Sequence, residues 1–126
     1  MEHCMHCVDV YIRIHKILKV GGIQSHYIGF DAHGVFPPHA NGHYGLTRRQ
    51  WEKLVGFRDP IRANLNCLPP SFHRAVMADL GSEISLWQPN YYSTDEQLVA
   101  ELAPDTLIPE SEANIRDCYV EAVKMK

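Results

Sequence analysis

The segment from His26 to Tyr44, HYIGFDAHGVFPPHANGHY, constrains the fold more than any other part of this sequence. Its glycines and the pair Pro37-Pro38 favour turns and interrupt any helical or strand periodicity. Four of the eight histidines of the chain lie within it. We therefore expect a binding loop here, held in place by regular elements on either side.

The loop carries one carboxylate and three imidazoles in the pattern D-x-H-x5-H-x3-H: Asp31, His33, His39 and His43. These side chains could converge on zinc or another divalent transition metal, or one imidazole could act as a general base oriented by the carboxylate. The helical motif H-E-x-x-H is not matched, because Pro38 and Gly42 disfavour a helix across this region. The alternative is a solvated turn whose histidines bind nearby backbone, so the cofactor is left unassigned.

Length and composition favour one globular domain over residues 1–126, with residues 1–7 frayed. The chain has 45% hydrophobic and 21% charged residues, which suits a workable core. No apolar run approaches the length of a membrane span, and the first residues lack the features of a signal peptide. We therefore expect a soluble, cytoplasmic protein without membrane contact.

The four cysteines are too sparse for a small disulfide scaffold, so reduced thiols are expected. Cys4-x-x-Cys7 is half of a zinc-binding pattern, but no second half follows at zinc-finger distance. A redox role is disfavoured, because a redox pair normally follows a strand and begins a helix. Cys67 and Cys118 are interpreted as small core residues.

Hydrophobic periodicity predicts three strands. The clearest covers residues 8–14, where apolar residues recur at every second position. After the turn signal Gly21-Gly22, residues 23–30 are expected to return as the second strand of a hairpin. A third strand is predicted over residues 83–87, ended by Pro89.

Four helices are predicted from capping and breaker residues. Thr47 with Gln50 forms a capping box for a helix that ends at Gly56. Three more helices are expected over residues 71–80, 94–102 and about 110–124. The fold class is therefore α+β, with a small, chiefly antiparallel sheet of about three strands packed with about four helices. His73, within the second helix, is expected to be exposed.

The two parts of the chain differ in charge. Residues 1–75 carry nine Lys or Arg and five Asp or Glu, whereas residues 76–126 carry three and ten. Such polarity predicts differently charged faces that guide association with a charged partner. The net charge of −3 argues against a general nucleic-acid binder, and no paired helix-turn-helix spacing is evident.

Two pairs of side chains are candidate contacts for an anion or a partner. Arg48 and Arg49 lie in the first turn of the helix that begins after Thr47, and arginine binds phosphate or carboxylate in a bidentate manner. Tyr91 and Tyr92 form an aromatic patch, because tyrosine buries a large surface and keeps a polar tip. The same residues could equally be a solvated face and a lid over the core.

Two classes of function remain. The preferred one is a non-enzymatic binding protein, such as a regulator, adaptor or inhibitor, that contacts another protein through charge-polarised and aromatic surfaces. The alternative is a small metal-dependent hydrolase or lyase with its site in residues 26–44 and an arginine holding an anionic substrate. A serine triad is not supported, because no serine lies in a nucleophile-elbow sequence. Separately, an exposed sheet edge could support a homo-oligomer.

Overall fold

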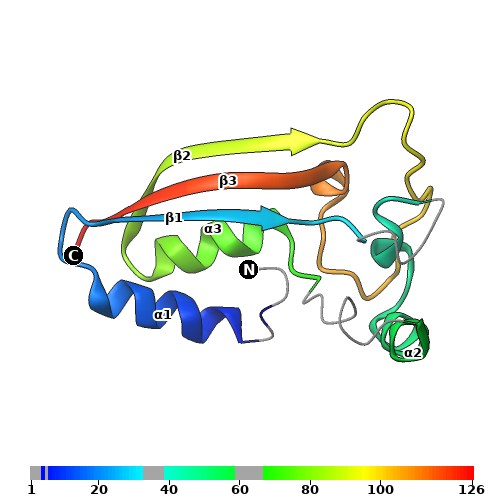
Figure 1. The fold of residues 1–126 in the computed structure, drawn as a ribbon, viewed down its shortest axis with the longest axis horizontal. Coiled ribbons are helices and arrows are strands. Elements are labelled where there is room, and N and C mark those ends of the chain that lie inside the picture. Colours follow the sequence, from blue (N-terminus) through cyan, green and yellow to red (C-terminus); the bar gives the residue numbers. More distant parts are fainter. Residues whose placement is uncertain (1–3, 5, 33–38, 59–66) are drawn as a thin grey trace.

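The computed structural model describes residues 4, 6–32, 39–58 and 67–126 of the chain. Its elements follow in this order: α1 (Cys7–Ile17), β1 (Ile23–Gly29), the 3₁₀-helix η1 (Gly42–Gly45), α2 (Arg48–Arg58), α3 (Pro70–Asp79), β2 (Ser82–Tyr91), the 3₁₀-helix η2 (Glu110–Glu112) and β3 (Ile115–Lys124). The strands form one antiparallel sheet in the order β1-β3-β2 (Figure 1). The α+β class with three strands is confirmed, although the described residues contain three α-helices instead of four.

The last strand, β3, is the centre of the sheet and pairs with both other strands. Val120 lies opposite His26 on β1 and opposite Trp87 on β2. Cys118, Val120 and Ala122 are fully buried, so burial recurs at every second residue, which is the period of a strand. The prediction of a helix over residues 110–124 is therefore wrong, apart from the single turn of η2.

The chain begins with a helix where the sequence shows its most regular alternation. Cys7 and Tyr11 are buried and Ile14 is half-buried, so one helical stripe faces the core although the apolar residues also alternate. The predicted strand over residues 8–14 is wrong, and so is the hairpin across Gly21-Gly22. Gly21, with φ of 80°, instead turns the chain from α1 into β1.

Local signals located α2 and α3 correctly. The Gln50 side-chain oxygen accepts hydrogen bonds from the Thr47 amide and hydroxyl, both at 2.8 Å, which confirms the capping box. α2 continues past Gly56, because a glycine inside a helix costs only about 1 kcal/mol relative to alanine. α3 ends before Gly81, which has a φ of 85°.

Two breaker-based predictions failed for tertiary reasons. β2 runs through Pro89 because it is an edge strand, where a missing N–H is tolerated. Residues 94–102 are not helical, because their backbone pairs with the loop before α2. The Gln97 carbonyl accepts the Ala40 amide at 3.0 Å, and the Val99 amide donates to the Asn41 side chain at 2.9 Å.

One side of the sheet is covered by α1 and α3, which both lie below the strands in the view of Figure 1. Tyr11 and Met77 from these helices pack with Ile28 and Val120 in the main hydrophobic cluster. The Tyr11 hydroxyl also lies 3.0 Å from Nδ1 of His73, which is fully buried. The prediction that His73 is exposed is therefore wrong. None of the described helices is long and apolar enough to cross a bilayer.

His26 makes this inner side of the sheet sensitive to acid. Its ring packs edge-to-face against Tyr11, with centroids 5.2 Å apart, and burial lowers the pKa of His26. The folded state thus favours the neutral imidazole. Its contribution to stability is complete above the unfolded pKa of about 6.5 and is lost as the pH falls below that value.

We therefore expect the urea midpoint of the wild-type protein to fall between pH 7.5 and pH 5.5, and to fall less in His26→Gln. Circular dichroism at both pH values measures the difference. An identical fall in the two proteins would assign the acid sensitivity to other groups.

Candidate functional site

The sheet face opposite α1 and α3, called here the outer face, is not covered by any of the described helices (Figure 1). Side chains alternate along β1 and β3, and along β2 apart from a register shift between Ile84 and Leu86, so one set of residues from each strand shares this face. The register sets the rows of the outer face as Ile23, Val123 and Glu83; Ser25, Glu121 and Leu86; Tyr27, Tyr119 and Gln88; and Gly29, Asp117 and Asn90.

Large apolar and aromatic side chains of this face are exposed. Ile23 is 57% exposed, Tyr27 62% and Leu86 39%. Tyr119 lies directly opposite Tyr27 in the register, which places two aromatic rings beside each other on neighbouring strands. Contiguous apolar surface of this kind marks interaction sites on soluble domains.

Carboxylates are set among these side chains and are held in place by hydrogen bonds. Asn90 donates to Asp117 at 2.6 Å, and the Tyr119 hydroxyl donates to Glu121 at 2.7 Å. The Tyr27 hydroxyl also bonds to Asp117, and this bond raises the pKa of Tyr27. Asp117 is only 9% exposed and already has these partners, so Glu121, which is half-buried, is the carboxylate better placed to accept a further cation.

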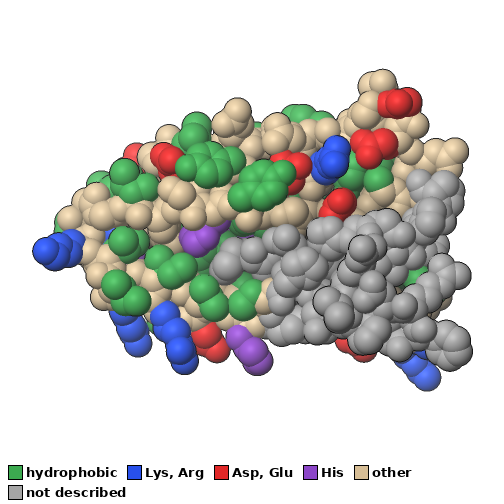
Figure 2. Space-filling view, in the orientation of Figure 1, with side chains coloured by type: hydrophobic (Ala, Val, Ile, Leu, Met, Phe, Trp, Pro, Cys, Tyr) green, Lys and Arg blue, Asp and Glu red, His purple; other side chains and the backbone are tan. Residues whose placement is uncertain are grey.

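The outer face carries an excess of negative charge. Its rows contain Glu83, Asp117 and Glu121, and within the part of the chain that the structure describes Arg116 lies beside them, with its Nε 4.0 Å from Asp117. In Figure 2, Asp and Glu side chains gather in the upper part of the molecule, whereas Lys and Arg gather along the lower left edge beneath α1. The attraction of this face is therefore for cations.

The two tyrosines predicted as contacts have different roles. Tyr91, at the end of β2, is 57% exposed and is available to a partner. Tyr92 is 8% exposed, and its hydroxyl donates to the Phe30 carbonyl at 3.2 Å and to the Ala40 carbonyl at 3.5 Å. Tyr92 therefore fastens the loop to the sheet instead of presenting its ring.

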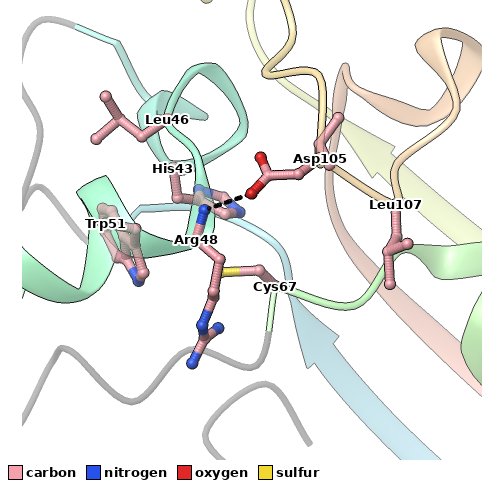
Figure 3. A pocket seen from close by; sticks show the side chains of 8 residues that line it. His43, Leu46, Arg48, Trp51, Cys67, Asp105 and Leu107 are labelled. Carbon is pink, nitrogen blue, oxygen red and sulfur yellow. Dashed lines mark hydrogen bonds between the residues drawn. The ribbon is translucent and has the colours of Figure 1, made fainter.

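A second candidate site is a surface pocket of about 240 Å³ at the start of α2 (Figure 3). It is lined by His43, Leu46, Arg48, Trp51, Cys67, Asp105, Thr106 and Leu107. His43 and Arg48 were sequence candidates, and the pocket brings them together. Asp105 was not a candidate and Cys67 was assigned to the core, because no local motif links either residue to α2.

The two charged side chains that line this pocket have different partners. Oδ2 of Asp105 accepts the backbone N–H of Arg48 at 3.1 Å, at the helix end where a negative charge is favoured. The Arg48 side chain donates from Nε to Glu52 at 2.7 Å. The predicted role of Arg48 as an anion site is thus weakened by its acidic neighbours, and Arg49 lies exposed on the next position of the helix.

The thiol of this pocket is not an activated nucleophile. Burial raises the pKa of Cys67 to about 11, and the nearby Arg48 guanidinium only partly opposes this effect. The thiol is thus protonated at neutral pH. Beside it, Trp51 is 1% exposed and its indole N–H has no acceptor within the described residues. A buried donor left without a partner costs about 1–3 kcal/mol.

The histidine-rich loop is described only in part. His43 is buried, with its ring centroid 3.8 Å from that of Tyr44, while Asp31 and His39 are half-buried. Among the described residues, no three His, Cys, Asp or Glu side chains are placed to hold a metal ion. His33 lies outside the described residues, so the four-ligand site stays a prediction.

The Cys4-x-x-Cys7 pair lies at a helix start, contrary to the sequence argument, because α1 begins at Cys7. Burial is nevertheless the main influence on Cys7 and, together with nearby Cys4, it raises the pKa of the Cys7 thiol. A redox pair needs the opposite shift. None of the described cysteines is part of a disulfide, and Cys118 lies in the core as expected.

Comparison with known proteins finds no matching family model, no matching curated protein and no matching solved structure. The function must therefore be inferred from the geometry and charge of these two sites.

Proposed function

We propose that the protein is a non-enzymatic binding protein whose outer face docks a basic segment of another polypeptide. The observation that carries this proposal is one open sheet face on which exposed apolar side chains alternate with carboxylates that lack equal positive charge. Apolar area supplies free energy of association, at about 25 cal/mol per Å² removed from water. The carboxylates supply selectivity and speed of encounter.

The side-chain chemistry of the outer face favours arginine or lysine. Tyrosine rings attract cations through their faces, and carboxylates accept charged hydrogen bonds from guanidinium or ammonium groups. Tyr27 and Tyr119 lie in the row between the two that carry Glu121 and Asp117, so a single cationic side chain can reach both kinds of group. Nucleic acid would be repelled by this face. A second copy docked face to face would oppose carboxylates to carboxylates.

The dimensions of the outer face suit one segment of chain. Three strands spaced about 4.8 Å apart, with a rise of about 3.3 Å per residue, give a footprint roughly 10 Å wide and 25 Å long. A single helix is about 10–12 Å wide with its side chains. We therefore infer that the partner presents one helical or extended segment with basic residues beside apolar ones. The buried area of such an interface is at the small end of the range for protein–protein complexes, where transient interactions are found.

Site-specific photo-cross-linking tests this proposal. Ser25 is exposed on the outer face between Ile23 and Tyr27, so Ser25→p-benzoylphenylalanine places the probe there without removing a proposed contact. Lys16, exposed on α1, takes the same probe in the control protein. We expect adducts from extract only with the probe at position 25, and mass spectrometry should locate them in a segment rich in Lys or Arg.

Two results would contradict the proposal. Identical adducts from both positions would show that contact is not selective for the outer face. Adducts formed only between two copies of the chain would identify the partner as the protein itself.

A further inference from the structure

We propose that the pocket at the start of α2 binds a small uncharged ligand that carries an amide or lactam group on an apolar body. The pocket is separate from the outer face and is built by α2, η1 and two distant loop positions, Cys67 and Asp105. Three requirements of its lining define this ligand: an acceptor for one buried donor, a donor for one carboxylate, and no negative charge.

The need for an acceptor comes from Trp51. Its indole lines the pocket and is almost completely buried, and its N–H makes no hydrogen bond within the described residues. Tryptophan can only donate, so only an acceptor oxygen or nitrogen satisfies it. A ligand carbonyl that enters the pocket supplies such an oxygen.

The need for a donor comes from Asp105. Figure 3 shows Trp51 on one side of the pocket and Asp105 with Leu107 on the other, with His43 and Cys67 between them. The carboxylate of Asp105 offers acceptor oxygens to a ligand donor. An amide or lactam carries a carbonyl acceptor and an N–H donor, which are the two kinds of group that this lining calls for.

The charge of the pocket disfavours an anionic ligand. The Arg48 guanidinium is paired with Glu52 at 2.7 Å, whereas the exposed Asp105 carboxylate accepts a backbone N–H and has no cationic side-chain partner among the described residues. Leu46, Trp51 and Leu107 provide apolar surface for the body of the ligand. A volume of about 240 Å³ is below the roughly 300–1,000 Å³ of drug-sized sites, so the ligand is of fragment size.

Benzamide and benzoate form a matched pair of probes for this site, because they differ mainly in charge and in the presence of an N–H donor. In Trp87→Phe protein, Trp51 is the sole tryptophan and reports on the pocket by fluorescence. We expect benzamide to change Trp51 emission with a dissociation constant on the order of 1 mM, and benzoate to bind at least about 10-fold more weakly.

Asp105→Asn provides the control on the protein side. It keeps an oxygen that can accept the Arg48 amide but removes the charge, so affinities for the two probes should come within about threefold of each other. Saturation-transfer NMR on the unmodified chain repeats the comparison without any substitution.

Several results would overturn the proposal. Tighter binding of benzoate than of benzamide would identify an anion site. The absence of both emission change and NMR transfer at tens of millimolar would show that the pocket holds water only. An unchanged preference for benzamide over benzoate in Asp105→Asn would show that the Asp105 carboxylate does not determine the selectivity of the pocket.

Discussion

Replacing Ile28 with alanine is expected to lower the free energy of unfolding by about 2–5 kcal/mol, the range for truncation of a large buried aliphatic side chain. Ile28 is fully buried on β1, opposite Cys118 of the central strand, and packs in the cluster that contains Tyr11 and Met77. The truncation leaves a cavity between the sheet and both covering helices. Urea unfolding followed by circular dichroism at pH 7.5 measures the loss.

The matched control is Ile23→Ala, the same substitution on the same strand. Ile23 belongs to the outer face and is largely exposed, so the expected change is below about 0.5 kcal/mol. Ile23 and Ile28 lie on opposite faces of β1. Equal losses from the two substitutions would contradict the assignment of inner and outer faces.

Replacing Glu112 with leucine is expected to destabilise the protein by about 1.5–3 kcal/mol, the range for hydrogen bonds to a charged group. The Glu112 carboxylate is buried and accepts the Ser71 amide and an Arg74 N–H, both at 2.9 Å. The residue before α3 is Pro69, which offers no side-chain cap, so Glu112 satisfies the start of this helix from a distant part of the chain. Because Arg74 is partly exposed, water can replace part of the hydrogen bond that Arg74 loses with Glu112.

Glu110→Leu is the control for Glu112→Leu. Glu110 lies in the same 3₁₀-helix, but its side chain is exposed. Its replacement should change the free energy of unfolding by less than about 0.5 kcal/mol. A comparable loss at both positions would mean that the leucine, and not the missing cap, causes the effect.

Local chemistry predicted those elements whose boundaries depend on caps and turns. The Thr47–Gln50 box located the start of α2, Gly81 located the end of α3, and Gly21-Gly22 located the start of β1. These signals act within one turn of chain and need no tertiary contact. That is why they held although the overall order of elements was wrong.

The prediction assigned a strand to residues 8–14, which are helical, and a helix to residues 110–124, which contain β3. Both segments have hydrophobic patterns that are compatible with either structure. Residues 8–14 and 115–124 both mix β-branched and aromatic residues at spacings that satisfy a strand or a helix. Tertiary contacts decide whether each segment forms a strand or a helix. β3 gains hydrogen bonds on both sides as the central strand, whereas α1 only has to bury one stripe against α3 and the sheet.

The candidate sites depend on those same long-range pairings. The outer face exists only when β3 is a strand, which sets Tyr119 and Glu121 beside Tyr27 and Leu86. The alternation of Cys118, Val120 and Ala122 with these polar residues was the signal that could have revealed it. The pocket joins Cys67 and Asp105 to α2, a proximity that no sequence spacing encodes. Tyr92 turned inward because the register shifts between Asn90 and Tyr91.

The most direct test of the binding face is a charge exchange between the protein and its cross-linked partner segment, prepared as a synthetic peptide. Glu121→Lys reverses one carboxylate of the outer face, and a peptide with one Lys or Arg changed to Glu reverses the other side. We expect the Glu121→Lys variant to bind the wild-type peptide at least about 10-fold more weakly than the wild-type protein does. The variant should bind the charge-exchanged peptide with most of the lost affinity restored. Recognition of a basic segment by the outer face would be contradicted if both proteins bound the wild-type peptide with equal affinity and the variant showed no preference for the charge-exchanged peptide.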